Sequence, residues 1–208
     1  MKNTQVFIAA LYLLYATTVN AQTSAEVKLV APLEEDRGWC LDLRGSRQNA
    51  APIGGVHGHT CYTYEGNGVA LDQGFFVENV YEANEFRMSG FPDLCMTLYE
   101  PNAGSFVSIE TCDDRPTQDF VLSESGKIIS EMRPELCLTV DDFVLPGGGG
   151  SPLHIMRDVS FEECDAVDSV YQTWELRSEW NGLEEATLPR PYEDGAGPAG
   201  PPGGMGAG

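Results

Sequence analysis

Short apolar runs alternate with polar residues along most of the chain, and clusters of Gly, Pro, Asn and Asp separate them. Alternation with a period of two is typical of β-strands that bury one face. Runs of this kind include residues 75–77, 106–109, 127–129 and 173–176. After the first 21 residues no segment carries the 3.6-residue period of a helix. The pattern therefore predicts an all-β protein of about twelve short strands.

The first 21 residues have the organisation of a signal peptide. Lys2 supplies the positive charge, residues 6–15 form an apolar stretch, and Val19-Asn20-Ala21 ends with a small residue at the cleavage position. The alternative is an anchor helix that stays attached. We expect cleavage after Ala21, so that the mature protein begins at Gln22 and is secreted into the extracellular space.

Three motifs follow one another in the same order three times. Each copy begins with a cysteine, an apolar residue, Asp or Thr, and a second apolar residue. A strand-like segment and a second cysteine follow, and each copy ends with a Gln-x-aromatic motif. The motifs are formed by Gln73 and Phe75, by Gln118 and Phe120, and by Gln172 and Trp174. Repetition of an ordered set of motifs indicates three equivalent structural units.

The six cysteines are even in number and belong to a chain that we expect to be exported, so disulfides are expected. Six cysteines can pair in many ways, and the internal repeat selects one bond within each unit. The expected pairs are Cys40–Cys61, Cys95–Cys112 and Cys137–Cys164.

Together these motifs resemble the ricin B-chain type lectin family, whose members are β-trefoils of three repeats with a Gln-x-Trp motif in each. The resemblance covers about residues 26–178, and Phe75 and Phe120 stand where the family has Trp. It implies a β-trefoil with three intra-repeat disulfides. It also implies that the glutamine motifs serve the fold and that their aromatic side chains fill its centre.

The resemblance also implies where a sugar would bind. The family places a carboxylate just after the Cys-apolar pair, and here only Asp42 meets this requirement, because Thr97 and Thr139 stand in the other repeats. Hydrogen bonds to a charged acceptor are stronger than those to a neutral one, and a hydroxyl cannot accept two bonds as a carboxylate does. We therefore expect one site, in the first repeat.

The remaining site positions of the family fall on His57 and His59, and on the pair Asp72-Gln73. His59 departs from the family's preference for Trp, Tyr or Phe, and Asp72 replaces the usual Asn. The resemblance thus implies a weak site for a galactose-like or other neutral sugar. Its residues would be Asp42, His57, His59, Asp72 and Gln73, and the nearby Tyr62 and Tyr64 could add a stacking face.

The net negative charge of the chain argues against some classes of binding partner. The chain has 12 basic and 32 acidic residues, a formal net charge of −20, and it would repel nucleic acid and anionic membranes. No apolar stretch is long enough for a membrane-spanning helix. We expect glycans as partners, with either self-association or attachment to another subunit. The alternative is a degenerate trefoil that acts as a protein-interaction or inhibitor module without binding sugar.

The sequence offers little support for metal binding or catalysis. His57 and His59 lie two residues apart and would share one face of a strand, where with Asp42 they could suit zinc or copper. A lone His-x-His is a weak signal, so we expect no metal and no cofactor. No catalytic motif is present, so we expect no enzyme.

Composition divides the chain into three parts. Residues 1–21 form the expected signal peptide, residues 22–180 form the expected trefoil domain, and residues 181–208 are rich in Gly and Pro. Such a composition is typical of a disordered tail. Within the domain, residues 146–152 include four consecutive glycines, which predict a flexible loop.

Overall fold

The structure, a computed structural model, describes residues 22–45, 49–63 and 69–178. The expected signal peptide (1–21), the expected tail (181–208) and Tyr64 lie outside the described residues. Within the described part of the chain, no helix is long and apolar enough to cross a membrane.

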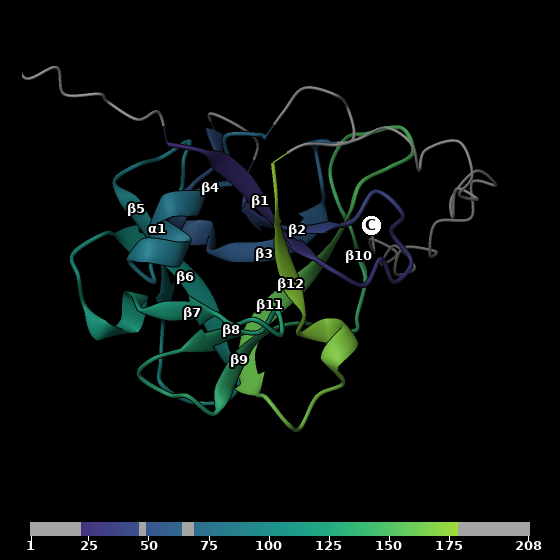
Figure 1. Ribbon diagram of the computed structural model, residues 1–208. Coiled ribbons are helices and arrows are strands. Elements are labelled where there is room, and N and C mark those ends of the chain that lie inside the picture. The colour runs from purple at the N-terminus through teal and green to yellow at the C-terminus, as the bar shows by residue number, and fades with distance from the viewer. Residues whose placement is uncertain (1–21, 46–48, 64–68, 179–208) are drawn as a thin grey trace, which may run out of the picture.

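The described residues form twelve short strands, as the alternation predicted (Figure 1). The all-β prediction and the approximate strand number are therefore confirmed. The strands are Ser24–Leu29 (β1), Trp39–Leu43 (β2), Val56–Thr60 (β3), Gly74–Phe76 (β4), Leu94–Leu98 (β5), Ser105–Thr111 (β6), Phe120–Leu122 (β7), Ile128–Ser130 (β8), Leu136–Val140 (β9), Leu145–Pro146 (β10), Ile155–Glu163 (β11) and Trp174–Arg177 (β12). One helix, Val77–Glu82 (α1), and short 3-10 turns at Pro52–Gly54, Pro116–Gln118 and Ser169–Tyr171 connect them.

Each repeat contains one antiparallel hairpin, built from β2 and β3, from β5 and β6, and from β9 and β11. The residues two positions after the first cysteines occupy equivalent places in the three hairpins. In β2, Asp42 lies opposite His57, whereas in the other two hairpins a threonine lies opposite a serine. The three repeats are therefore equivalent in backbone but differ in chemistry at this position.

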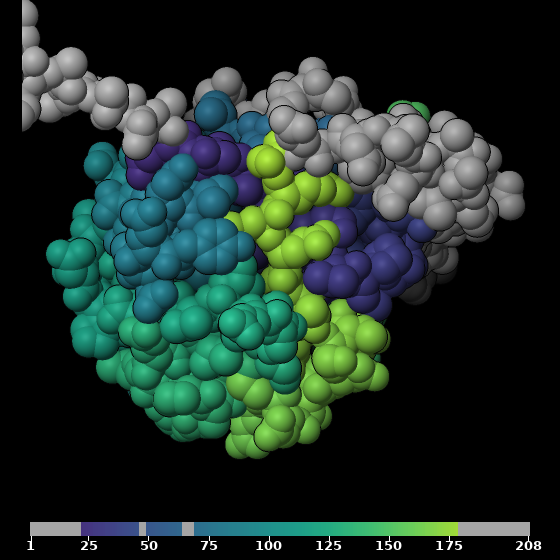
Figure 2. All heavy atoms as spheres, viewed as in Figure 1, coloured from purple at the N-terminus to yellow at the C-terminus, as the bar shows by residue number. Residues whose placement is uncertain are grey.

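The two ends of the described chain are joined by strand pairing. β1 pairs antiparallel with β12, with Glu26 opposite Arg177 and Leu29 opposite Trp174. Figure 2 shows the purple N-terminal segment and the yellow C-terminal strand in contact at the surface. The first strand of repeat one is thereby held by the last strand of repeat three.

The helix α1 corrects one expectation. The apolar run 75–77 predicts a continuous strand, but β4 ends at Phe76 and α1 begins at Val77. Only Val80 of this helix is buried, and six residues span less than two turns, so no helical period can be read from the sequence. Glu78, in the first turn of α1, accepts hydrogen bonds from the backbone N–H of Thr23 at 3.0 and 2.9 Å, which ties the helix to the residue before β1.

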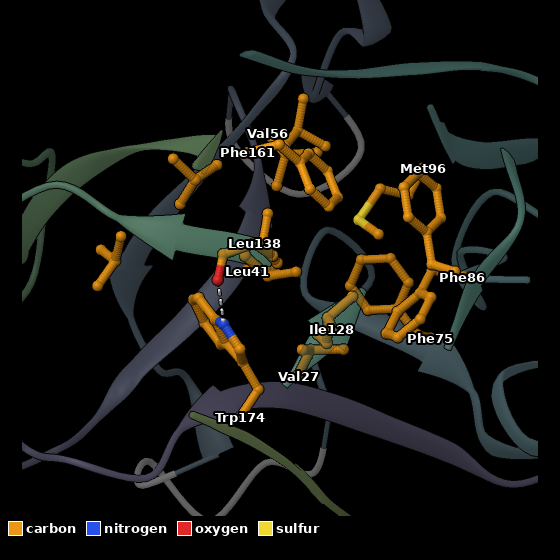
Figure 3. Packing of buried hydrophobic residues seen from close by; sticks show 14 of the residues in the cluster. Val27, Leu41, Val56, Phe75, Phe86, Met96, Ile128, Leu138, Phe161 and Trp174 are labelled. Atoms are coloured by element: carbon orange, nitrogen blue, oxygen red, sulfur yellow. Dashed lines mark hydrogen bonds between the residues drawn. The ribbon is translucent and has the colours of Figure 1, made fainter. Parts of the chain in front are cut away.

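The aromatic residues of the glutamine motifs lie in the hydrophobic core (Figure 3). Trp174 donates its Nε1–H to the carbonyl of Leu138 at 3.0 Å, which satisfies the one polar atom of the indole. Phe75 and Phe120 have their ring centroids 6.1 and 6.3 Å from that of Phe86. Phe86, in the segment between α1 and β5, thus packs against both rings.

The three disulfides join the pairs that the internal repeat predicted: Cys40–Cys61, Cys95–Cys112 and Cys137–Cys164. In each repeat the bond links the start of the first hairpin strand to the segment at or just beyond the end of the second. The prediction of three intra-repeat disulfides is confirmed.

Removing the third disulfide should lower the free energy of unfolding by about 3 kcal/mol, because the bond restricts the unfolded chain. It joins residues 27 apart in sequence, against 17 for the second bond. The double variant Cys137→Ala, Cys164→Ala should therefore lose slightly more stability than Cys95→Ala, Cys112→Ala. Urea unfolding of both variants and the oxidised parent measures this, and parental stability in either variant would contradict it.

Candidate functional site

The expected sugar-binding residues lie where β3 is held between β2 and β11. Asp42 on β2 faces His57 on β3, and Cys40 faces His59. On the other side of β3, Met156 of β11 lies opposite His59. Since side chains two residues apart point to the same face of a strand, His57 and His59 lie on the face that carries Asp42.

Asp42 is held by the glutamine of its own repeat. Gln73 donates from Nε2 to Oδ2 of Asp42 at 2.7 Å and to the carbonyl of Thr60 at 3.1 Å. Its Oε1 accepts the backbone N–H of Tyr62 at 2.9 Å. The amide therefore joins the two hairpin strands to the chain that follows the second cysteine, and it fixes the carboxyl group in place.

The other repeats make the same connection without a carboxylate. Gln118 donates to Oγ1 of Thr97 at 3.0 Å, and Gln172 donates to Oγ1 of Thr139 at 2.8 Å. Each threonine hydroxyl in turn donates to the carbonyl of the cysteine two residues earlier. A neutral hydroxyl thus satisfies the glutamine completely, so the fold does not require an acid at this position.

Burial makes Asp42 difficult to ionise. Its side chain is 3% exposed, and burial raises the pKa of Asp42 to about 8, with His59 opposing this shift and Asp72 adding to it. Burial also lowers the pKa of His57 to about 4 and lowers the pKa of His59. Near neutral pH the two imidazoles are therefore uncharged, and the carboxyl group readily retains a proton.

The two imidazoles flank the carboxyl group without a close hydrogen bond to it. Nε2 of His57 is 3.8 Å from Oδ1 of Asp42, and Nδ1 of His59 is 3.7 Å from Oδ2. His59 instead places Nδ1 3.0 Å from the carbonyl of Thr60. Donation to this carbonyl fixes the tautomer, leaving the lone pair of His59 on Nε2.

A third histidine, from the third repeat, joins this cluster. The ring of His154 packs edge-on against His59 and Tyr62, with centroids 5.3 and 5.2 Å away. The ring centroid of His57 also lies 5.4 Å from that of His59. The sequence placed His154 in a strand-like segment and gave it no role, because the rings that it contacts, His59 and Tyr62, are 95 and 92 residues away in the sequence.

The glycine loop, residues 147–150, closes over these rings. A Cβ atom at Gly147 would lie 3.0 Å from Nε2 of His59, and one at Gly150 would lie 2.5 Å from Nε2 of His154. The close approach of backbone to imidazole therefore requires glycine at both positions.

A bidentate ion pair fixes the end of this loop. Arg37 binds Glu35 through Nε and Nη2, each at 2.6 Å, and also donates to the carbonyls of Pro152 and Leu153 at 2.9 and 3.0 Å. The first repeat thereby fixes the segment of the third repeat that carries His154.

A hollow of about 460 Å³ opens beside the cluster. Its lining is Arg44, Gly45, His57, His59, Tyr62, Gly148, Gly149 and Met156. The structure brings the five expected residues into one region, but it buries all of them, and Asp42, Asp72 and Gln73 lie beneath the hollow without lining it. Sequence reasoning missed Arg44, Met156 and His154, and it predicted a flexible loop at residues 146–152 without giving that loop a part in the site.

Among the described residues, two groups of side chains have the spacing of metal ligands. Glu26 lies with Cys40 and Cys61, and Glu85 lies with Cys95 and Cys112. In both groups the two sulfurs are joined in a disulfide, which removes the thiolates that would bind a metal. Neither group is therefore a metal site in the oxidised protein.

Comparison with known proteins identifies the fold. No protein-family model matches the chain, and no curated protein matches its sequence. The β-trefoil lectin domain of the Vibrio vulnificus hemolysin/cytolysin, solved with N-acetyl-D-lactosamine bound, is 18% identical with a TM-score of 0.51, over 77% of this chain and 98% of that one. The C-half of the earthworm R-type lectin, in complex with GalNAc, is 16% identical with a TM-score of 0.50, over 76% of this chain and 99% of that one.

A third similar structure is the solution structure of the mdaA-1 domain. It is 16% identical with a TM-score of 0.53, over 82% of this chain and 98% of that domain. The chain therefore has the β-trefoil fold of ricin B-type lectin domains, and the resemblance is confirmed at the level of the fold.

Replacing Asp42 with Thr, as in the other two repeats, should stabilise the protein at pH 8 by about 1–3 kcal/mol, because no acid is then buried. The unfolded carboxyl ionises near pH 3.8 and the folded one near pH 8, so the parent loses stability as the pH rises between these values. At pH 4 the difference should nearly vanish. Urea unfolding at both pH values measures it, and equal destabilisation at both would refute it.

Proposed function

We propose that the protein is a secreted carbohydrate-binding module with one weak site in the first repeat, for a galactose-like or other neutral sugar. The observation that carries the proposal is the carboxyl group of Asp42. The equivalent threonines Thr97 and Thr139 satisfy their glutamines fully. A buried acid is unfavourable where a hydroxyl suffices, so its presence favours a role in binding.

The geometry suits recognition of hydroxyl groups. Gln73 binds Oδ2 of Asp42, while the described hydrogen bonds leave Oδ1 facing His57 at 3.8 Å. A sugar hydroxyl donating to Oδ1 would form a charge-assisted bond once Asp42 ionises. The hollow of about 460 Å³ falls within the usual size of small-molecule pockets.

Access to Asp42 requires a side-chain movement. Because Asp42 lies beneath the hollow, a ligand first meets His57, His59 and Tyr62. The rings of His59 and Tyr62 are 5.3 Å apart and tilted by 48°, so Tyr62 can supply the flat face that His59 provides only in part. Rotation of His57 away from Oδ1 would then open the carboxyl group to the sugar.

Several further features fit this proposal. The Vibrio vulnificus domain is described with N-acetyl-D-lactosamine bound and the earthworm domain with GalNAc, both of them neutral sugars. The net charge of −20 disfavours anionic glycans. The three disulfides fit an oxidising compartment, as secretion after cleavage of residues 1–21 requires.

Adhesion through one weak site per chain requires several linked copies of the chain. A shallow sugar site often binds with a Kd of about 1 mM, near −4 kcal/mol. Linking copies raises the effective concentration, so adhesion would require self-association or attachment to a partner subunit.

The burial of Asp42 favours a second candidate, a protein-interaction or inhibitor module that binds no sugar. In that case Asp42 would only serve as the acceptor for Gln73, and partner binding would use exposed loops. Ile53 and Phe143 are apolar residues of this kind, with exposed fractions of 98% and 67%. This alternative predicts that binding of the partner protein does not change when Asp42 is replaced.

An array of neutral glycans, probed with the oxidised full-length protein presented as a multimer, tests the proposal. We expect binding to one class of neutral sugar, and we expect Asp42→Asn to weaken it at least tenfold, because the one carbonyl oxygen of Asn accepts from Gln73 and an NH2 group then stands where Oδ1 would accept from the sugar. Thr97→Ser is the matched control, since it keeps the hydroxyl that Gln118 requires. A blank array from folded protein, or binding unchanged in Asp42→Asn, would favour the second candidate.

A further inference from the structure

We propose that His57, His59 and His154, together with Asp42, bind a divalent transition metal, Zn²⁺ or Cu²⁺. The proposal does not depend on sugar binding. It revises the expectation from the sequence, where two histidines and a carboxylate alone were too weak a signal. Only the fold shows that a third imidazole, that of His154, lies beside the other two.

The first observation is the convergence of the histidines. The whole chain has three, and all three lie in one cluster, with the rings of His57 and His154 each next to that of His59. Two come from β3 of the first repeat, and His154 comes from the segment before β11 in the third. Arg37 fixes that segment from the first repeat by binding the carbonyls of Pro152 and Leu153. The cluster is therefore held together by the tertiary fold.

The spacing of the rings fits a shared metal ion. Zinc–nitrogen bonds are 2.0–2.1 Å long, so two imidazoles on one tetrahedral zinc have their ring centroids about 5 Å apart. The centroid of His59 lies 5.4 Å from that of His57 and 5.3 Å from that of His154. Asp42 lies beside these rings, with Oδ1 3.8 Å from Nε2 of His57, close to the separation of two ligands around such an ion.

The second observation concerns the nitrogens themselves. Nδ1 of His57 is buried without a hydrogen-bond partner among the described residues, and the side chain is 8% exposed. A buried polar atom without a partner is unfavourable, and a bound ion would satisfy it. His59 places Nδ1 against the carbonyl of Thr60, which is the usual outer hydrogen bond of a metal-binding histidine and leaves Nε2 to bind the ion.

The surroundings permit the adjustment that binding requires. As described, the donor atoms do not share one centre, so the rings must turn about their side-chain bonds. Nε2 of His59 and Nε2 of His154 face Gly147 and Gly150, where no Cβ obstructs them. The adjoining hollow, lined by His57 and His59, provides an entry path for a hydrated ion.

The donor set also selects the class of metal. Three imidazoles and one carboxylate suit zinc and copper, whereas calcium and magnesium prefer oxygen ligands alone. The acidic character of the protein would raise the local concentration of any cation, but it does not supply the imidazoles. Calcium therefore serves as the control ion for charge alone.

Calorimetric titration of the chelator-treated, oxidised full-length protein with Zn²⁺, and separately with Cu²⁺ and Ca²⁺, tests the proposal. We expect one Zn²⁺ per chain and no heat from Ca²⁺. His154→Phe keeps the ring packing and removes the nitrogens, and it should weaken Zn²⁺ binding at least tenfold. Tyr99→Phe, which likewise keeps a ring and removes a polar atom but lies on an exposed stack with Phe106, is the matched control and should bind as the parent does.

Two results would overturn the proposal. One is the absence of binding of both Zn²⁺ and Cu²⁺ to the folded parent. The other is parental affinity in folded His154→Phe, which would leave only a surface His-x-His pair. If His154→Phe does not fold, His57→Phe serves as the second variant, and visible absorption of the Co²⁺-loaded parent reports whether the ion is four-coordinate. Because no sugar is present, failure here leaves the glycan-array result unaffected.

Discussion

The structure depends on the side-chain amides of three glutamines, one at the end of each repeat. Each Nε2 donates both to the residue two positions after the first cysteine and to a backbone carbonyl near the second. These bonds tie both strands of a hairpin to the chain that leaves it, at a buried position where a lost partner would be unfavourable. The neighbouring disulfide fixes the same junction covalently.

The same connection distinguishes one repeat from the other two. Where the acceptor is Thr97 or Thr139, the junction is neutral and complete. Where it is Asp42, an acid is buried, and its raised pKa follows first from the loss of water, with the nearby charge of Asp72 adding to the shift. The first repeat thus carries a group that the fold tolerates without needing it. This asymmetry within a symmetric fold is the physical basis for placing function there.

The third repeat completes the site of the first. The pairing of β11 with β3, and the binding of Arg37 to the carbonyls of Pro152 and Leu153, bring His154 and the glycine loop over His59. The loop is therefore part of the site, and its glycines are required by the close approach of backbone to imidazole. The proposed sugar and the proposed metal would both contact these histidines. The sugar would bind Asp42 beneath them, and the metal would bind the histidine nitrogens.

The sequence by itself determined the repeat, the strand content, the disulfide pairing and the uniqueness of Asp42. These features depend on the order of motifs along the chain and on the alternation of apolar and polar residues. Strand geometry and disulfide formation translate such local patterns into structure without long-range information. Only the tertiary structure decided that Asp42 is covered, that Phe86 packs against Phe75 and Phe120, and that α1 follows β4. It alone brought His154 to His59 across 95 residues. Burial and long-range contact arise from packing between repeats, and no pattern within one repeat encodes them.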